Sequence, residues 1–183
     1  MYPALEAMDG DDAGRRWLYE YLVEKTDGVR LPDRRDIDPS EMRHLLTAIN
    51  LVDLIRDDGR FRLRYRLVGS LQSYFFAGNR NVTGHFIDDF WAHDPAALSA
   101  IETEYRAAVE RRAPVTSEFR HSRDKHEYLR YRRTIFPLTN GREEIECFIC
   151  FHAYESRDAV QGHEDLDRNP VSRKAPPPMK MDD

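Results

Sequence analysis

The most regular pattern of hydrophobic and polar residues lies between residues 60 and 67. Apolar side chains alternate there with arginines, in the order Arg60, Phe61, Arg62, Leu63, Arg64, Tyr65, Arg66 and Leu67. A period of two predicts a β-strand with one buried face and one solvated face. Asp57-Asp58-Gly59 comes just before this strand and is typical of a hairpin turn, so residues 49–55 are expected to form its partner strand.

Helical periodicity appears near the N-terminus and in the middle of the chain. Residues 13–26 predict an amphipathic helix, whose apolar face carries Trp17, Leu18, Tyr21 and Leu22. An acid followed by proline at Asp38-Pro39 predicts the start of a second, short helix that runs to about Leu46. Three further helices are expected at residues 70–76, 87–91 and 94–111.

Three more strands are expected after these helices, at residues 115–121, 128–136 and 144–154. The last of them is apolar on both faces, with Ile145, Cys147, Ile149 and Phe151 on one face and Phe148 and Cys150 on the other. Such a strand must be covered on both sides. The helices between residues 70 and 111 can cover one face. Either the N-terminal helix or a second subunit must cover the other.

Four short segments support a family resemblance for this order of elements. They are Leu31-Pro32 with Asp36, Asp38 and Pro39; Arg64-Tyr65-Arg66-Leu67-Val68-Gly69; Thr83-Gly84 followed by Phe86; and Phe136-Pro137-Leu138. Over roughly residues 14–154 the chain resembles the PAS superfamily of sensory domains, and more narrowly the stand-alone PAS-like proteins common in alphaproteobacteria. The resemblance implies an α+β fold with a five-stranded antiparallel sheet in the order two-one-five-four-three. It names no ligand or cofactor, because PAS domains bind many or none.

Composition and charge limit the possible partners. The 183 residues suffice for one domain, expected at residues 13–154, with a flexible N-terminus at 1–12 and a polar, disordered tail at 155–183. The net charge of -5 gives no reason to expect nucleic acid or an anionic membrane as partner. With no apolar run of about 18 residues and no pattern of a signal peptide, we expect a cytoplasmic protein.

The cysteines and histidines offer little for a metal or cofactor. Cys147 and Cys150 lie three apart on a strand and point to opposite faces, so they are interpreted as two buried hydrophobic residues rather than zinc ligands. No cysteine lies in the helical region where a flavin photoreceptor carries one, so a flavin adduct is not expected. His85 and His93 are candidates for a haem ligand, with a surface or capping role as the alternative.

A binding pocket is predicted between the sheet and the helices that cross it. Its expected ligand-binding residues are Tyr65, Arg66, Tyr74, Phe75, Phe90, Tyr131 and Ile149, and the same face is expected to carry Phe61, Leu63, Leu67 and Leu129, with Leu71 opposite. The arginine row of residues 60–66 has two interpretations, a solvated strand face or a site for an anionic ligand or acidic helix. Arg66 is the best single candidate for the second.

The sequence therefore predicts a stand-alone sensory or regulatory domain that is not an enzyme and has no output domain of its own. It would act by docking onto another regulatory protein, with or without a small ligand. A homodimer, or a contact with a different protein, is expected through Trp17, Leu18, Tyr21 and Leu22. The alternative is a small cone-shaped α+β enzyme of the isomerase or dehydratase type. Such an enzyme needs a buried Asp or His in its pocket, and the sequence nominates none.

Overall fold

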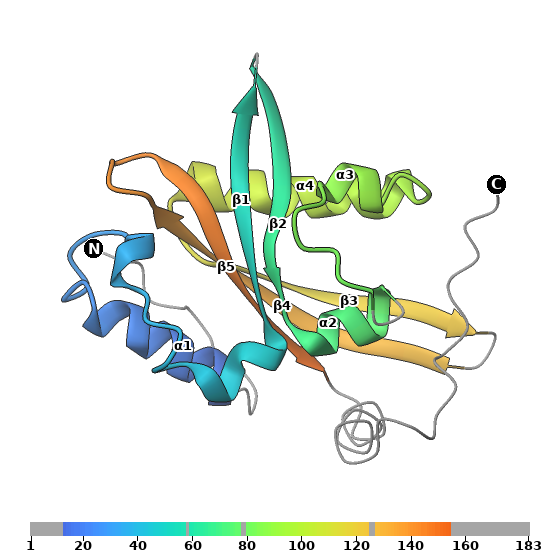
Figure 1. The fold of residues 1–183 in the computed structure, drawn as a ribbon, viewed down its shortest axis with the longest axis horizontal. Coiled ribbons are helices and arrows are strands. Elements are labelled where there is room, and N and C mark those ends of the chain that lie inside the picture. Colours follow the sequence, from blue (N-terminus) through green and yellow to red (C-terminus); the bar gives the residue numbers. More distant parts are fainter. Residues whose placement is uncertain (1–12, 58, 78–79, 125–126, 155–183) are drawn as a thin grey trace.

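The computed structural model describes residues 13–57, 59–77, 80–124 and 127–154, with the backbone alone at 57, 120–124 and 127–129. Its centre is one antiparallel sheet in the order β2-β1-β5-β4-β3 (Figure 1). The strands are β1 (Ile49–Asp57), β2 (Arg60–Val68), β3 (Val115–Asp124), β4 (Glu127–Thr139) and β5 (Ile145–Tyr154). This order confirms the predicted fold class. The predictions for residues 1–12 and 155–183 lie outside the described residues.

The helices follow the predicted positions with two exceptions, an unpredicted short helix at residues 34–36 and the start of the next one. They are α1 (Ala13–Glu24), the 3-10 helices η1 (Arg34–Asp36) and η2 (Arg43–Ala48), α2 (Ser70–Phe76), α3 (Ile87–Phe90) and α4 (Pro95–Arg111). The predicted start of a helix at Asp38 is wrong. The Asp38 carboxylate accepts a hydrogen bond from the Ser40 backbone N–H at 2.9 Å and so stabilises a turn, and η2 begins only at Arg43. None of the described helices is long and apolar enough to cross a membrane.

The sheet has an inner face, covered by α2, α3 and α4, and an outer face, covered in part by α1 and η2 (Figure 1). The protein's own α1 thus provides the cover that the sequence left open between a helix and a second subunit. Leu18 and Leu22 have no exposed surface, and Tyr21 is 6% exposed. These three side chains cannot form the expected dimer interface while α1 stays docked. Trp17, which stacks on Tyr21, is only partly buried.

A β-bulge in β2 changes which side chains share a face. Leu51 pairs with Leu67 and Val52 with Tyr65, so Arg66 is an extra residue without a partner on β1. Beyond the bulge the alternation is reversed. Leu67 is 37% exposed rather than buried on the inner face, and that prediction is wrong.

A second irregularity separates the apolar residues of β5. Leu138 pairs with Cys147 and Thr139 with Ile145, so one residue of β5 is skipped between them. Ile145 therefore packs in the inner core, whereas Cys147 and Ile149 pack under α1 on the outer face. The predicted place of Ile149 in the inner pocket is wrong for this reason, because it pairs with Leu51 on the outer face.

The tight packing after the end of β2 explains why residue 69, in the segment that resembles the PAS family, is a glycine. A Cβ atom at Gly69 would lie within 2.8 Å of the backbone carbonyl oxygens of Leu46, Thr47 and Ile49. The Gly69 N–H also donates a hydrogen bond to the side chain of Asn50 at 3.0 Å. Only glycine allows η2 and the start of α2 to approach this closely.

Candidate functional site

Polar side chains lie among the apolar ones on the inner face of β4 and β5. Arg133 pairs with His152 and Tyr131 with Tyr154, and Ile135 and Cys150 continue the same two rows. Because successive residues of a strand point to opposite faces, all of these side chains face the helices. We call this region between the sheet and α2–α4 the inner layer.

A buried ion pair lies at one side of the inner layer. The Arg133 guanidinium bonds the Glu104 carboxylate of α4, with Nε at 3.2 Å from Oε2. The two side chains are 7% and 14% exposed. The guanidinium also lies over the rings of Phe119 and Tyr105, at 4.7 and 5.6 Å from their centroids. Burial lowers the pKa of Arg133, but Tyr105 and Glu104 outweigh it and raise that pKa, so the charge is kept.

A buried histidine lies on β5 directly opposite Arg133. His152 is 3% exposed and lies near the rings of Tyr131 and Tyr154, at 6.0 and 6.3 Å between centroids. Its imidazole has a hydrogen bond with the backbone of Ala48. Its Nδ1 has no hydrogen-bond partner among the described residues. Burial, with a smaller effect from the charge of Arg133, lowers the pKa of His152 to about 3, so the ring is neutral near pH 7.

Tyrosine hydroxyl groups make the inner layer more polar still. The Tyr154 hydroxyl donates to the side-chain oxygen of Gln72 on α2 at 2.8 Å. The Tyr105 hydroxyl lies 3.1 Å from the Cys150 sulfur. Burial raises the pKa of Tyr131 to about 12, so its phenol stays protonated. The inner layer thus combines neutral hydrogen-bonding groups and aromatic rings around the buried ion pair.

A family model for the PAS domain matches residues 11–150 of this chain. The chain belongs to the PAS domain family. The match includes every helix and strand except the last residues of β5. The comparison with curated proteins found no significant match to this sequence.

Solved structures similar to this PAS domain include three light-oxygen-voltage proteins. One, from work on a flavin analogue, is 16% identical with a TM-score of 0.42, over 73% of this chain and 98% of that one. An RNA-binding light-oxygen-voltage receptor is 16% identical with a TM-score of 0.43, over 76% and 42%. The LOV protein of Rhodobacter sphaeroides is 13% identical with a TM-score of 0.41, over 74% and 85%. The TM-scores of these three structures are all below 0.5. The assignment to the PAS domain family therefore rests on the family model alone.

The structure divides the predicted ligand-binding residues of the PAS domain between two faces. Tyr65, Phe75 and Tyr131 are buried in the inner layer, and Tyr74 and Phe90 pack against them. Arg66 and Ile149 lie on the outer face and do not share this layer. Leu129 lies outside the described side chains. A ligand-binding role for the five inner residues stays a prediction.

Other sequence candidates also lie away from the inner layer. His85 and His93 are exposed, and His93 stacks on the ring of Trp91 at 5.8 Å. Cys147 and Cys150 pack in the outer and inner cores, which confirms that they point to opposite faces. Among the described residues, no group of three or more His, Cys, Asp and Glu side chains is placed to hold a metal ion.

Sequence reasoning missed the polar members of the inner layer. His152 continues the alternation of Phe148 and Cys150, and Arg133 continues that of Tyr131, so their face could have been read from the sequence. The alternation did not lead to a prediction of buried Arg and His side chains, because charged and polar side chains are usually exposed. A partner for Arg133 could not be read, since Glu104 is 29 residues away on a helix.

His152 is expected to make the stability of the PAS domain depend on pH. Because its pKa falls from 6.5 to about 3 on folding, the unfolded chain takes up the proton first as the pH falls. The contribution to stability is complete above pH 6.5 and is lost below it, by about 1.4 kcal/mol per pH unit. Urea unfolding between pH 7 and 5, above the range of the carboxylates, measures this slope. His152→Asn should flatten it and His93→Asn should keep it; an equal slope in both variants would contradict the prediction.

Proposed function

We propose that this PAS domain is a sensory domain that binds a small, uncharged molecule in the inner layer beside His152. The observation that supports this most directly is the buried, unpartnered Nδ1 of a neutral imidazole. A buried acceptor without a donor costs about 1–3 kcal/mol, and a ligand N–H or O–H group would remove that cost. An ordered water is the simplest competitor for this position.

The neighbouring groups indicate the kind of ligand. The rings of Tyr131 and Tyr154 flank the imidazole and favour a flat molecule. Arg133 places a positive charge on this face, and Glu104 already neutralises it, so a charged ligand gains little. A planar heterocycle or phenol that donates one hydrogen bond to Nδ1 fits these constraints.

The same site offers a route by which binding can change a surface. Tyr154 contacts the ring of Phe75 at 4.6 Å and bonds Gln72, and both partners belong to α2, a helix of only seven residues. A ligand that moves the Tyr154 ring therefore moves α2. We include in this proposal that the signal is passed on when the domain docks onto another regulatory protein. A homodimer and a cytoplasmic location stay predictions.

The enzyme alternative gains no support from the inner layer. Acid–base chemistry needs a carboxyl or imidazole that can gain and lose a proton near neutral pH. His152 has a pKa of about 3, and the Glu104 carboxylate is bound by Arg133. In a sensory role the neutral His152 serves as a hydrogen-bond acceptor, and the Glu104 carboxylate serves in a structural ion pair with Arg133.

Native mass spectrometry of the freshly purified full chain tests the proposal. The wild type and the His93→Phe control are expected to carry a small molecule that is released on denaturation, and His152→Phe is expected to lose it. An absorbance spectrum of the same sample shows whether the molecule is aromatic. If the wild type shows only its sequence mass, both as purified and after incubation with a small-molecule extract of the expression host, the proposal is wrong.

A further inference from the structure

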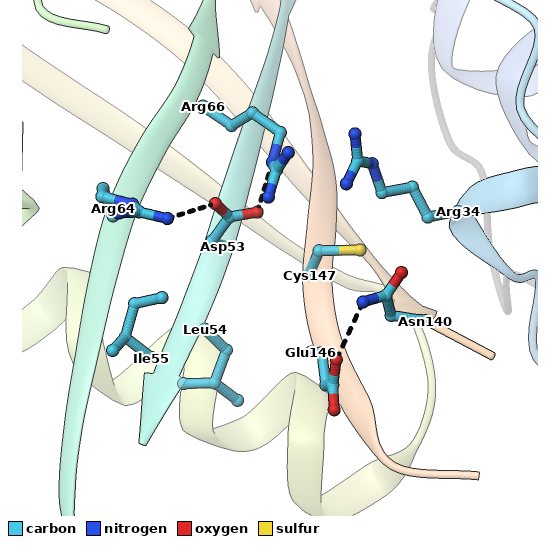
Figure 2. Close-up of a pocket in the computed structure, with 9 residues that line it drawn as sticks. All are labelled: Arg34, Asp53, Leu54, Ile55, Arg64, Arg66, Asn140, Glu146 and Cys147. Atoms are coloured by element: carbon cyan, nitrogen blue, oxygen red, sulfur yellow. Dashed lines mark hydrogen bonds and ion pairs between the residues drawn. The ribbon is translucent and has the colours of Figure 1, made fainter. Parts of the chain in front are cut away.

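The outer face of the sheet holds a second feature, which shares none of the polar residues of the inner layer. A pocket of about 120 Å³ lies where the outer face of β1, β2 and β5 meets η1 and the turn after β4 (Figure 2). The side chains that give it its character are Arg34, Asp53, Arg64, Arg66, Asn140 and Cys147. At this volume it can hold a group of a few heavy atoms.

Asp53 stands between two of the arginines. Its carboxylate accepts a hydrogen bond from Arg66 Nε at 2.6 Å and another from Arg64 Nη2 at 3.2 Å. Arg64 and Arg66 are two residues apart on β2 and therefore point to the same side of the sheet, and Asp53 lies opposite Arg64 on β1. The Asp53 side chain is 8% exposed, while those of Arg64 and Arg66 are 40% and 39% exposed. One buried carboxylate thus holds two guanidinium groups at the pocket and leaves their outer N–H groups accessible.

A third guanidinium reaches the pocket from outside the sheet. Figure 2 shows Arg34 extending from η1 toward Arg66. Among the side chains that the structure describes, no carboxylate lies within ion-pair distance of Arg34. The second acid of the pocket, Glu146, accepts a hydrogen bond from Asn140 at 3.0 Å and lies at the opposite end. Three arginines therefore face two carboxylates, and the excess positive charge lies at Arg34.

The backbone that carries Arg34 is fixed to the sheet. The Asp33 carboxylate accepts hydrogen bonds from the Arg35 N–H at 2.9 Å, from the Thr139 hydroxyl at 3.2 Å and from the Gly141 N–H. These bonds tie η1 to the turn between β4 and β5. The charge of Arg34 also affects Cys147, which lines the pocket. Burial raises the pKa of the Cys147 thiol to about 12, and Arg34 is the charge that lowers this pKa most.

We propose that Arg34, Arg64 and Arg66 form a site for an oxyanion of the phosphate type on the outer face of the domain. Guanidinium groups bind such oxygens through paired, charge-assisted hydrogen bonds, which are stronger than those between neutral groups. The anion would bridge η1 and β2, the two sides of the pocket. Free phosphate and a phosphate monoester carry the same group, and the volume of the pocket admits that group from either source.

Calorimetric titration of the full chain with inorganic phosphate and with O-phosphoserine, at constant ionic strength, tests this site. At least one of the two is expected to bind, and the tighter one identifies the source. Arg34→Gln and Arg66→Gln should each weaken binding about tenfold or more, because each removes charge-assisted hydrogen bonds. Arg60→Gln is the matched control, since Arg60 is exposed on the same strand outside the pocket, and it should leave the affinity unchanged.

A fourth variant tests whether the Asp53 carboxylate competes with the anion, while the Arg60→Gln control separates this site from a general attraction of anions. Asp53→Asn removes the competing carboxylate and should tighten binding. Circular dichroism checks that each variant is folded. Failure of both probes to bind the folded wild type would overturn the site, as would an equal loss in Arg60→Gln and Arg34→Gln. Neither result bears on the ligand proposed for the inner layer.

Discussion

Glu104→Gln is expected to lower the free energy of unfolding by about 3–5 kcal/mol, because it leaves the charge of Arg133 buried without its counter-ion. Arg133 has little access to water, with a side chain that is 7% exposed. The rings of Phe119 and Tyr105 compensate only part of a lost ion pair. Urea unfolding at pH 7 measures the loss.

The neighbouring residue of β4 supplies a matched control for this prediction. Arg132 points to the outer face and pairs with Glu118 at 2.9 Å, but the Glu118 side chain is 70% exposed. Glu118→Gln removes the same kind of pair from a solvated position and is expected to cost at most about 1 kcal/mol. Equal losses in Glu104→Gln and Glu118→Gln would show that the Arg133 pair is not sealed from water. Replacing both Arg133 and Glu104 with Met should recover much of the loss, since no buried charge remains.

Leu18→Ala is expected to cost about 2–5 kcal/mol of stability without changing the oligomeric state. Leu18 has no exposed surface and belongs to the core between α1 and the outer face, with Leu45 and Phe151. Its truncation leaves a cavity inside one chain. A role in a dimer interface would instead make the variant dissociate.

Sedimentation and urea unfolding of the same samples distinguish these two roles of α1. Arg16→Ala is the control, because Arg16 is exposed on the same helix and its loss should change stability by no more than about 0.5 kcal/mol. A stable Leu18→Ala protein with a lower mass than the wild type would contradict the packing described here. An unstable variant with unchanged mass supports it.

The sequence was sufficient for the order of elements because each strand and helix has its own local period. The alternation of residues 60–65 and the N-cap of α4 at Asp94, which accepts from the Ala97 N–H at 3.0 Å, both depend on near neighbours. The two irregularities could not be predicted in the same way. The bulge at Arg66 is defined only by its pairing with β1, and the skipped residue of β5 only by its pairing with β4.

These irregularities account for part of the errors in the predicted site. The bulge moves Leu67 to the outer face, and Ile149 lies there through its pairing with Leu51. Arg66 lies there simply because it alternates with Tyr65. Tyr65 precedes the bulge in β2, and Tyr131 pairs regularly with Phe119 and Tyr154, so both lie in the inner layer as expected. The interpretation of the arginine row as a plain solvated face also needs revision, because Arg62 pairs with Asp88 at 2.8 Å and Arg64 and Arg66 share Asp53.

The central claim is that a ligand group meets the free nitrogen of His152 inside this PAS domain. Long-range proton–nitrogen NMR of the His152 imidazole tests it most directly, with freshly purified protein compared with protein stripped of small molecules. At pH 7 we predict a neutral ring protonated on Nε2, whose Nδ1 resonance moves toward that of a bare acceptor when the ligand is removed. An Nδ1 resonance that is the same in both samples, or a doubly protonated ring at pH 7, would contradict the account.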